Sequence, residues 1–327
     1  MMNKPKLTFA IPTRNRIDNL KENLRTLVPQ LDEDSRLLII DNCSYKPVQD
    51  EIDDVIPSNR LFEFGIVRNS FDIGGNANIV RCYELCRTQW LCLIGDSRKV
   101  SNNIVTTLKR YMLQFPEATL INFYSPSKEH SPRHKLTVAK GKLSFVKEMG
   151  SLGNIILVGN SLINMRKIKS ISYGYQYCYS NAPQFVIPLM NMNEDSVCIL
   201  SPEKIIESCI QIPEGETRLS LIDFWIGSSS ILDLPLEHAV RVELAKKISG
   251  VDVQAQPYLC FFNSLLLFSV RPGKNKQARY YFHRVCSSRY YYNRSITMII
   301  KLFCTYVLLR LPFITRMLID FKKKFIK

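Results

Sequence analysis

A short apolar run that ends at an acid, Trp90–Ser97, constrains the fold of this chain more than any other stretch. The apolar residues Trp90–Ile94 are followed at once by Gly95, Asp96 and Ser97. Such a run is typical of a buried strand whose carboxyl end presents one acid to a crevice, where α/β sheets bind their ligands. Asp96 is therefore the first candidate functional residue. An ordinary turn followed by a helix cap is the alternative interpretation.

Two earlier segments repeat this pattern. Lys6–Pro12 predicts a first strand that ends at a proline, and the helical spacing of apolar residues over 17–28 predicts a helix after it. Leu37–Ile40 predicts a second buried strand, which stops at Asp41. This strand–helix–strand order predicts a parallel sheet with a nucleotide-sized crevice at its carboxyl edge.

A third predicted strand, Leu61–Val67, leads through Arg68 into a loop with two adjacent glycines, Gly74 and Gly75. Glycines allow close backbone approach, and a helix that starts at about Asn76 would aim free N–H groups at an anion. The loop is thus a candidate phosphate-binding loop, with a simple turn as the alternative.

These segments, taken in order, resemble the nucleotide-sugar half of family 2 glycosyltransferases of the GT-A fold, over residues 6 to about 115. The motifs that carry the resemblance are Phe9–Arg16, Ile39–Ser44, Arg68 with Gly74–Asn78, and Trp90–Ser97. The resemblance implies an α/β, Rossmann-like mixed sheet flanked by helices. It divides the chain into a nucleotide-sugar-binding half, residues 1–118, and an acceptor-binding half, residues 119–235.

The same resemblance implies roles for particular residues. Asp41 would accept a hydrogen bond from the base, and Asp96 occupies the place of the acid that binds a divalent cation, Mg²⁺ or Mn²⁺. That cation would neutralise the charge that develops on the leaving nucleoside diphosphate. The nucleotide-sugar site would comprise Pro12, Thr13, Arg14, Asp41, Arg68, Gly74, Gly75, Asn78, Asp96 and Arg98, with Asp96 also the metal ligand.

The metal motif departs from the family pattern. The usual run has two or three acids, whereas Asp96 is followed by Ser97, Arg98 and Lys99. One carboxylate can hold a hydrated cation when substrate phosphates supply further oxygen ligands, so we expect weak metal affinity. Our hypothesis is that Arg98 or Lys99 supplies part of the positive charge. Solvated cations at a helix start are the alternative.

The general base is not evident from the sequence. An inverting transferase needs one for the acceptor hydroxyl, normally Asp or Glu. Family members usually carry an acid at the start of a helix in the acceptor half, but the matching run offers Ser180 and Asn181. Asp195 and Asp223 are the remaining catalytic candidates, and the sequence does not separate them.

Positive charge is concentrated at the C-terminus. Residues 271–327 carry fourteen Lys or Arg against the single acid Asp320, in a chain whose net charge is +15. Apolar residues at helical spacing over 296–325, with cations on the other face, predict helices too short and too charged to span a bilayer. They favour a tail that lies in the interface of an anionic membrane, within a helical region at residues 236–327.

Two alternatives compete with a membrane partner for this tail. Basic residues mixed with tyrosines bind single-stranded nucleic acid, but the apolar content here exceeds what such an arm requires, so no nucleic acid partner is expected. In the other alternative, the basic helices pack on the body of the protein. Ten cysteines without a CxxC pair suit reduced thiols in a cytosolic protein.

Together these observations predict a cytoplasmic glycosyltransferase, peripheral on the inner face of the plasma membrane. It would move a sugar from a nucleotide-sugar donor to a glycan, or a lipid-linked glycan, as in bacterial O-antigen or capsule synthesis. The alternative from another class is a non-catalytic glycan-binding or scaffolding relative, because both the metal motif and the base are degenerate.

Overall fold

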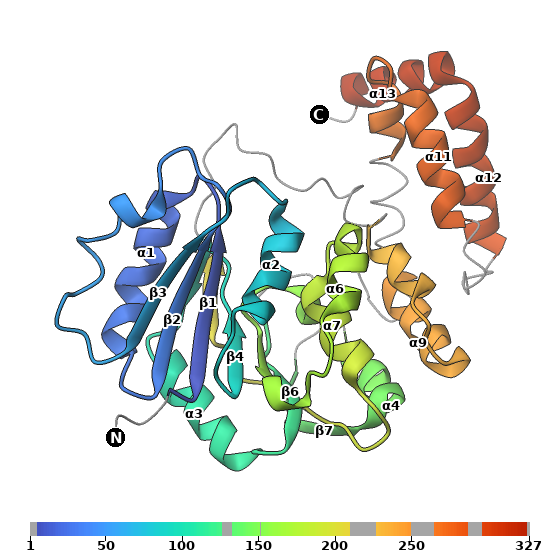
Figure 1. Cartoon of the computed structure of the whole chain (residues 1–327). Coiled ribbons are helices and arrows are strands. Elements are labelled where there is room, and N and C mark those ends of the chain that lie inside the picture. The colour runs from blue at the N-terminus through green and yellow to red at the C-terminus, as the bar shows by residue number, and fades with distance from the viewer. Residues whose placement is uncertain are drawn as a thin grey trace. The chain divides into compact units, whose positions relative to one another are not determined.

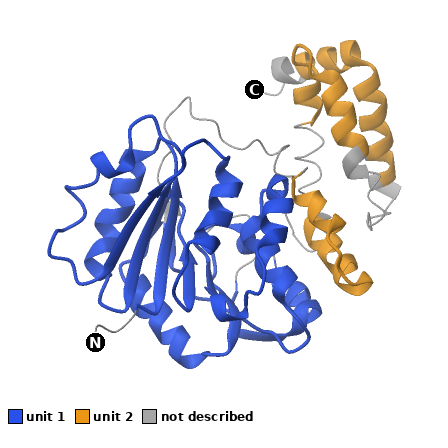
Figure 2. Ribbon diagram, viewed as in Figure 1, with its two compact units in different colours: residues 1–216 blue, residues 217–327 orange. Residues whose placement is uncertain are grey.

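The chain forms two compact units, residues 1–216 and 217–327 (Figure 2). The computed structural model describes residues 5–125, 133–150, 152–209, 227–249, 265–286 and 296–325. The candidate functional residues that fall within these ranges all belong to the N-terminal unit.

An eight-stranded mixed sheet forms the centre of the N-terminal unit (Figure 1). Its order is β3-β2-β1-β4-β8-β6-β9-β7. The strands are β1 (Leu7–Thr13), β2 (Ser35–Asp41), β3 (Glu63–Arg68), β4 (Trp90–Leu93), β6 (Ala118–Asn122), β7 (Thr137–Lys140), β8 (Ser161–Asn164) and β9 (Val197–Leu200). The strands β1 to β4 are parallel, β8 is antiparallel to β4 and β6, β9 is parallel to β6, and β7 is antiparallel to β9. The predicted mixed α/β sheet is confirmed.

Helices cover both faces of this sheet (Figure 1). On one face, α1 (Ile17–Leu27) and α3 (Ile104–Gln114) pack against the side chains of Phe9 and Ile11 in the main core. On the other face lies α2 (Gly75–Glu84), with α7 (Pro183–Asn191) packed against it. The shorter elements are β5 (Arg98–Val100), β10 (Ile206–Cys209), α4 (Gly141–Glu148), α5 (Leu152–Ile156) and α6 (Ser172–Gln176), with the 3₁₀ turns η1 (Val28–Gln30), η2 (Val48–Asp50), η3 (Met165–Lys167) and η4 (Cys178–Ser180).

The first strand runs one residue further than its sequence predicts. Pro12 pairs with Ile40 inside the β1–β2 ladder, and Thr13 is the last residue of β1. The Ala10 carbonyl accepts from the Ile94 amide, so this side of β1 faces β4, and Pro12 points the same way. Because β4 has ended at that level, no ladder partner needs the N–H that proline lacks.

The two predicted halves of the N-terminal body share this sheet. The predicted boundary at residues 118 and 119 falls in β6, and β8 pairs with β4 on one side and β6 on the other. The sheet is therefore continuous from the first half into the second, and both belong to one unit that ends near Glu216.

The C-terminal unit contains η5 (Ser230–Asp233), α9 (His238–Ser249), α11 (Asn275–Cys286), α12 (Ile296–Arg310) and α13 (Pro312–Phe325). A small core joins α11 and α12 through Leu265, Ala278, Phe282 and Leu309. The described regular structure of this unit is helical, as predicted for residues 236–327.

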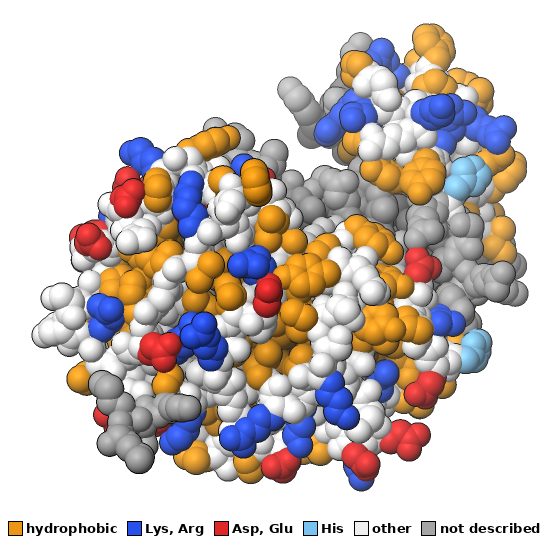
Figure 3. All heavy atoms as spheres, viewed as in Figure 1, with side chains coloured by type: hydrophobic (Ala, Val, Ile, Leu, Met, Phe, Trp, Pro, Cys, Tyr) orange, Lys and Arg blue, Asp and Glu red, His pale blue; other side chains and the backbone are white. Residues whose placement is uncertain are grey.

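An exposed apolar stripe runs along α13. It consists of Phe313, Ile314, Met317, Leu318 and Phe321. Hydrophobic, Lys and Arg side chains lie together on the visible face of α11 to α13 (Figure 3). No single described helix is long and apolar enough to cross a bilayer. The helical segments Leu302–Arg310 and Pro312–Phe321 reach the length and mean hydropathy of a membrane span only when they are taken together, and the pair is bent by 111°.

Candidate functional site

The carboxyl ends of β1, β2 and β3 lie side by side and form the base of the candidate site. Thr13 pairs with Asp41, and Asp41 pairs with Arg68. Beyond the strands, the Asn42 amide donates to the Thr13 carbonyl at 2.9 Å, and the Asn69 amide donates to the Asp41 carbonyl at 2.8 Å. The turn after β4 reaches the same edge, because parallel neighbouring strands end on the same side of a sheet. The predicted convergence of these segments is therefore observed.

Asp96 lies in the turn after β4 and faces the loop between β1 and α1. Its Oδ2 accepts a hydrogen bond from the Thr13 hydroxyl at 3.0 Å, and its Oδ1 lies 3.3 Å from a guanidinium nitrogen of Arg16. The Asp96 side chain is 9% exposed, whereas the Arg16 side chain is 26% exposed. An ion pair thus links the loop after β1 to the turn after β4, and the arginine is its more exposed partner.

The ionisation of Asp96 reflects this environment. Burial raises the pKa of the Asp96 carboxyl above its usual value, and the charge of Arg16 and the Thr13 hydroxyl only partly oppose the effect. A carboxyl held in this way depends on a nearby cation to stay charged, and Arg16 is that cation in the structure.

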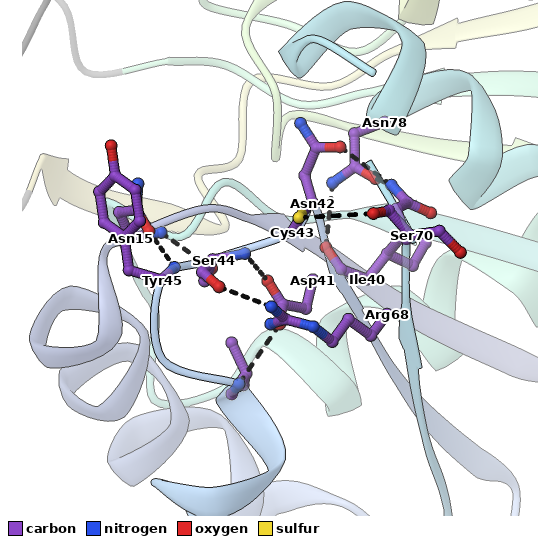
Figure 4. A network of polar contacts seen from close by, with 12 residues as sticks. Asn15, Ile40, Asp41, Asn42, Cys43, Ser44, Tyr45, Arg68, Ser70 and Asn78 are labelled. Carbon is purple, nitrogen blue, oxygen red and sulfur yellow. Dashed lines mark hydrogen bonds and ion pairs between the residues drawn. The ribbon is translucent and has the colours of Figure 1, made fainter. Parts of the chain in front are cut away.

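Asp41 is almost completely buried, and its carboxylate is surrounded by donors (Figure 4). It accepts hydrogen bonds from the Ser44 amide at 2.8 Å, the Val48 amide at 3.3 Å and the Arg68 guanidinium. The second guanidinium nitrogen of Arg68 donates to the Ser44 carbonyl at 2.7 Å. Burial alone raises the pKa of Asp41, but these bonds outweigh it and lower the pKa. Asp41 therefore holds Arg68 and the turn after β2.

A network of amide side chains fixes the loop between β3 and α2. The Asn69 side chain donates to both Asn42 and Asn78, and the Asn78 side chain donates to the Ile40 carbonyl at 2.9 Å. Asn42 in turn donates to Asp72 at 2.6 Å. Asn78, which the resemblance assigns to the nucleotide, is buried in this network and shapes the loop from beneath.

The upper part of the same loop is open. Gly74 adopts a φ of +82°, and neither Gly74 nor Gly75 has an atom within 4 Å of the place where a Cβ would lie. The amides of Gly75, Asn76 and Ala77 precede the first helical donor of α2, the Asn78 amide, which bonds to the Gly74 carbonyl. The start of α2 is therefore accessible to an anion, as the sequence predicts.

Two further contacts connect neighbouring loops to this one. Arg14 lies 3.1 Å from Asp72, and the Asp72 side chain accepts from the Gly74 amide at 2.9 Å. From the second half of the sheet, Asn181 accepts from the Asn76 side chain at 2.8 Å. Asn181 has a positive φ of 59° just before α7, so the start of α7 meets the start of α2.

Arg98 begins β5, two residues after Asp96. Its amide donates to the Gly95 carbonyl at 3.0 Å, and its Cγ would lie 3.1 Å from a Cβ on Gly95. Gly95 therefore makes room for the stem of Arg98. In the antiparallel ladder between β5 and β10, Arg98 pairs with Cys209.

Asp195 lies away from these residues. It is 87% exposed, pairs with Lys140 at 3.4 Å and lies two residues before β9. Since β9 runs in the same direction as β4, Asp195 lies at the amino edge of the sheet and Asp96 at its carboxyl edge. This position does not fit a general base for chemistry at the carboxyl edge. Asp223 lies outside the described residues and stays a prediction.

Among the residues that the structure describes, the donor set near Asp96 does not suit a divalent cation. Mg²⁺ requires near-octahedral oxygen coordination, and Mn²⁺ likewise favours carboxylate, carbonyl and water oxygens. Asp96 is the one acid in its turn, and both of its oxygens already accept from Thr13 and Arg16. Within the described ranges, no group of three His, Cys, Asp or Glu residues is placed to hold a metal.

The sequence analysis assigns no role at the site to Arg16, Asn42, Asn69 or Asn181. No spacing rule marks an arginine or asparagine in a loop, since each acts through contacts with residues distant along the chain. The available signal was the density of polar residues after β1 and β2, Thr13–Arg16 and Asn42–Ser44.

Comparison with known proteins supports the same fold. Residues 8–158 match the family described as glycosyl transferase family 2. The structure is similar to that of S. aureus TarS 1-349 in complex with UDP-GlcNAc, with a TM-score of 0.55 and 12% identity over 93% of this chain and 90% of that chain. It is also similar to mannosyltransferase PcManGT from Pyrobaculum calidifontis in complex with GDP-Man and Mn²⁺, with a TM-score of 0.52 and 10% identity over 94% and 87% of the two chains. No curated protein matches the sequence.

Proposed function

We propose that this chain, of which residues 8–158 match glycosyl transferase family 2, is a glycosyltransferase of the GT-A fold that transfers a sugar from a nucleotide-sugar donor to a glycan. The observation that carries the proposal is the convergence at one sheet edge of Thr13, Arg68, the open Gly74–Gly75 turn and Asp96. Loops at the carboxyl edge of an open α/β sheet are where such folds bind nucleotides.

The nucleotide would lie over the loops that follow β1, β2 and β3. In this proposal Asp41 acts indirectly, because its carboxylate is buried and already accepts three hydrogen bonds. It positions Arg68, whose side chain is 37% exposed and so reaches a ligand. The diphosphate would lie near the start of α2, where amides and the helix dipole favour negative charge.

The transfer itself requires three linked events. The acceptor hydroxyl oxygen attacks the anomeric carbon, the bond from that carbon to the diphosphate breaks, and the hydroxyl proton passes to a base. We propose an inverting displacement with Asp223 as the remaining candidate base. Asp195, the other acid that the sequence offers, lies at the amino edge of the sheet, which leaves Asp223 as the candidate.

The acceptor is proposed to be a lipid-linked glycan, as in O-antigen or capsule synthesis, with the enzyme peripheral on the cytoplasmic face of the membrane. Two features support this. The stripe of Phe313, Met317 and Phe321 on α13 is exposed, and residues 271–327 carry fourteen cations against one acid. Apolar and cationic side chains together suit a helix in the interface of an anionic bilayer.

A binding-only relative is the second candidate. Asn181, an amide, stands at the start of α7 where an acid would serve as base, and it contacts Asn76 of the donor loop. A protein of this kind would bind donor or glycan without turnover.

Purified full-length protein, incubated with UDP-, GDP- and dTDP-linked sugars with and without Mn²⁺, tests the proposal. We expect release of nucleoside diphosphate from at least one donor, and its loss in Asp96→Ala. Donor binding without any release, in the presence of membrane lipid extracts as acceptor source, would favour the binding-only alternative. Activity that persists unchanged in Asp96→Ala would contradict the proposed site.

A further inference from the structure

A cluster of tyrosines on α6 and η4 adjoins the start of α2. It consists of Tyr173, Tyr175, Tyr177 and Tyr179. We propose that Tyr179, stacked on Tyr177, forms a platform for a neutral sugar ring of the acceptor glycan. This inference rests on the proposed function, because it names where the transferase binds its acceptor.

Three rings of the cluster form a short stack. The centroids of Tyr177 and Tyr179 lie 5.7 Å apart with an interplanar angle of 23°, and Tyr173 follows at 6.4 Å from Tyr177. Tyr173 and Tyr177 are half-buried, whereas Tyr179 is 56% exposed. Tyr179 is therefore supported by Tyr177 and open to solvent over much of its surface.

The helix that leads into the stack is packed tightly against its neighbours. A Cβ at Gly174 would lie 2.6 Å from Ile187 in α7 and 3.2 Å from Val80 in α2. The Tyr175 hydroxyl donates to Glu84 at the end of α2, at 2.8 Å. The helix α6 is thus fixed against both α2 and α7 (Figure 1). A ligand would meet rings that are already in place, which reduces the entropy cost of binding.

The cluster runs along α2 toward the donor loop. Tyr175 contacts Glu84 in the last turn of α2, and Asn181 contacts Asn76 in the first turn. Tyr179 lies between these two contacts and is only two residues from Asn181, on a turn that packs against α2. The first turn of α2 is where we propose that the diphosphate lies. A sugar ring on Tyr179 would therefore lie beside the donor.

The chemistry of the segment suits an uncharged ligand. Residues 170–193 contain no Asp, Glu, Lys, Arg or His, in a chain that is 22% charged. Nucleic acid and anionic lipid are instead bound by surfaces rich in Lys and Arg. Aromatic faces pack against the apolar C–H faces of pyranose rings. Tyrosine hydroxyls and the exposed amide of Gln176 can exchange hydrogen bonds with sugar hydroxyls.

Saturation-transfer NMR of the full-length protein with neutral disaccharides tests the inference. The probes are cellobiose, lactose, mannobiose and N,N′-diacetylchitobiose. We expect at least one to bind through the C–H protons of one ring face, and Tyr179→Ala to weaken its affinity about 3- to 10-fold. Tyr179→Phe should retain binding because it keeps the aromatic face. Tyr179→Leu should weaken binding as alanine does, because it keeps only the apolar bulk.

The matched control is Tyr280→Ala. Tyr280 is 63% exposed on α11, with its ring 6.0 Å from that of Tyr281, and its loss should leave disaccharide affinity unchanged. Thermal melting of each variant separates lost binding from lost folding, and Tyr179→Leu keeps the test valid should Tyr179→Ala melt early.

Equal disaccharide affinity in the wild type and Tyr179→Ala would overturn the inference, as would the failure of every disaccharide to bind. Titration with UDP-GlcNAc separates the two possible sources of the sugar. Weaker UDP-GlcNAc binding in Tyr179→Ala, with disaccharide binding unchanged, would assign the ring to the donor sugar and overturn the acceptor platform. Disaccharide binding that depends on Tyr179, in a protein that binds neither UDP nor GDP, would contradict the proposed transfer and leave the sugar platform intact.

Discussion

The Arg68 guanidinium closes over the Asp41 carboxylate, and the two residues are neighbours in the β2–β3 ladder (Figure 4). Asp41 is 1% exposed and Arg68 is 37% exposed, so one partner is in the core and the other at the surface. The pair thus connects the buried sheet to the loops that form the site, and disturbing it should affect both stability and binding.

Arg68→Gln should destabilise the N-terminal unit. The variant removes a charge-assisted hydrogen bond from a buried carboxylate, which costs about 1.5–3 kcal/mol of unfolding free energy. The Ser44 and Val48 amides still donate to Asp41, so the unit should remain folded. Urea unfolding followed by tryptophan fluorescence measures the change. The control is Arg60→Gln, which replaces an exposed arginine in the loop before β3. An equal effect of the two substitutions would show that the pair contributes nothing specific.

The same pair should make stability depend on pH in the acid range. The pKa of Asp41 is lower in the folded chain than its usual value of 3.8, so the unfolded chain binds the proton more tightly. The contribution of Asp41 is therefore complete above about pH 5 and is lost as the pH falls through the folded pKa. Asp96 acts in the opposite direction, because burial raises its pKa and its protonation favours the folded state.

Urea midpoints of the wild type and of Asp41→Asn between about pH 3 and pH 7 would measure this effect. The difference between the two proteins should stay constant from about pH 7 to pH 5 and shrink as the pH is lowered further toward 3. A difference that stays constant over the whole range would mean that Asp41 does not titrate as proposed.

The N-terminal half of the sheet was accessible from sequence for a physical reason. Strands buried on both faces must be apolar throughout, and the runs in β1, β2 and β4 stand out because each ends at a polar residue. The order of β8, β6, β9 and β7 was not accessible, since it is decided by pairing between segments far apart in the chain.

The errors at the site have the same origin. Asp195 is an acid next to a strand, like Asp96, but it precedes its strand whereas Asp96 follows one, so the two lie at opposite edges. The role of Asp41 was assigned from its place after β2. Its burial beneath Arg68 depends on β3, which no local pattern around residue 41 reveals. Local pattern thus located the edge, while long-range contacts decided which side chains face the ligand.

The two glycines at the start of α2 should respond differently to alanine. Gly74 has a φ of +82° and a ψ of 148°, a region that is essentially restricted to glycine and strains an L residue by about 1–3 kcal/mol, while Gly75 has no such φ. Gly74→Ala should therefore lower the melting temperature, and Gly75→Ala should leave it unchanged or raise it slightly.

Nucleoside diphosphate affinity distinguishes a structural role of these glycines from a role in binding. A Cβ at Gly75 meets no atom within 4 Å, so Gly75→Ala changes only the space open to a ligand. We expect this variant to weaken nucleoside diphosphate binding several-fold at full stability. Unchanged affinity in Gly75→Ala, measured by calorimetric titration with UDP and with GDP, would place the diphosphate elsewhere.

The exposed stripe on α13 should bind anionic membranes. Phe313, Met317 and Phe321 recur at four-residue intervals on one face of the helix, where they bury little surface within the unit. Replacing all three by serine should leave the melting temperature of the protein nearly unchanged and abolish flotation with vesicles of phosphatidylglycerol and phosphatidylcholine. The matched control is Leu309→Ala, which removes a side chain from the small core and should lower stability rather than vesicle binding.

Wild-type protein should float less with vesicles of phosphatidylcholine alone, and less at high salt, because part of the attraction is electrostatic. Flotation that is lost on nuclease treatment instead would assign the basic tail to nucleic acid.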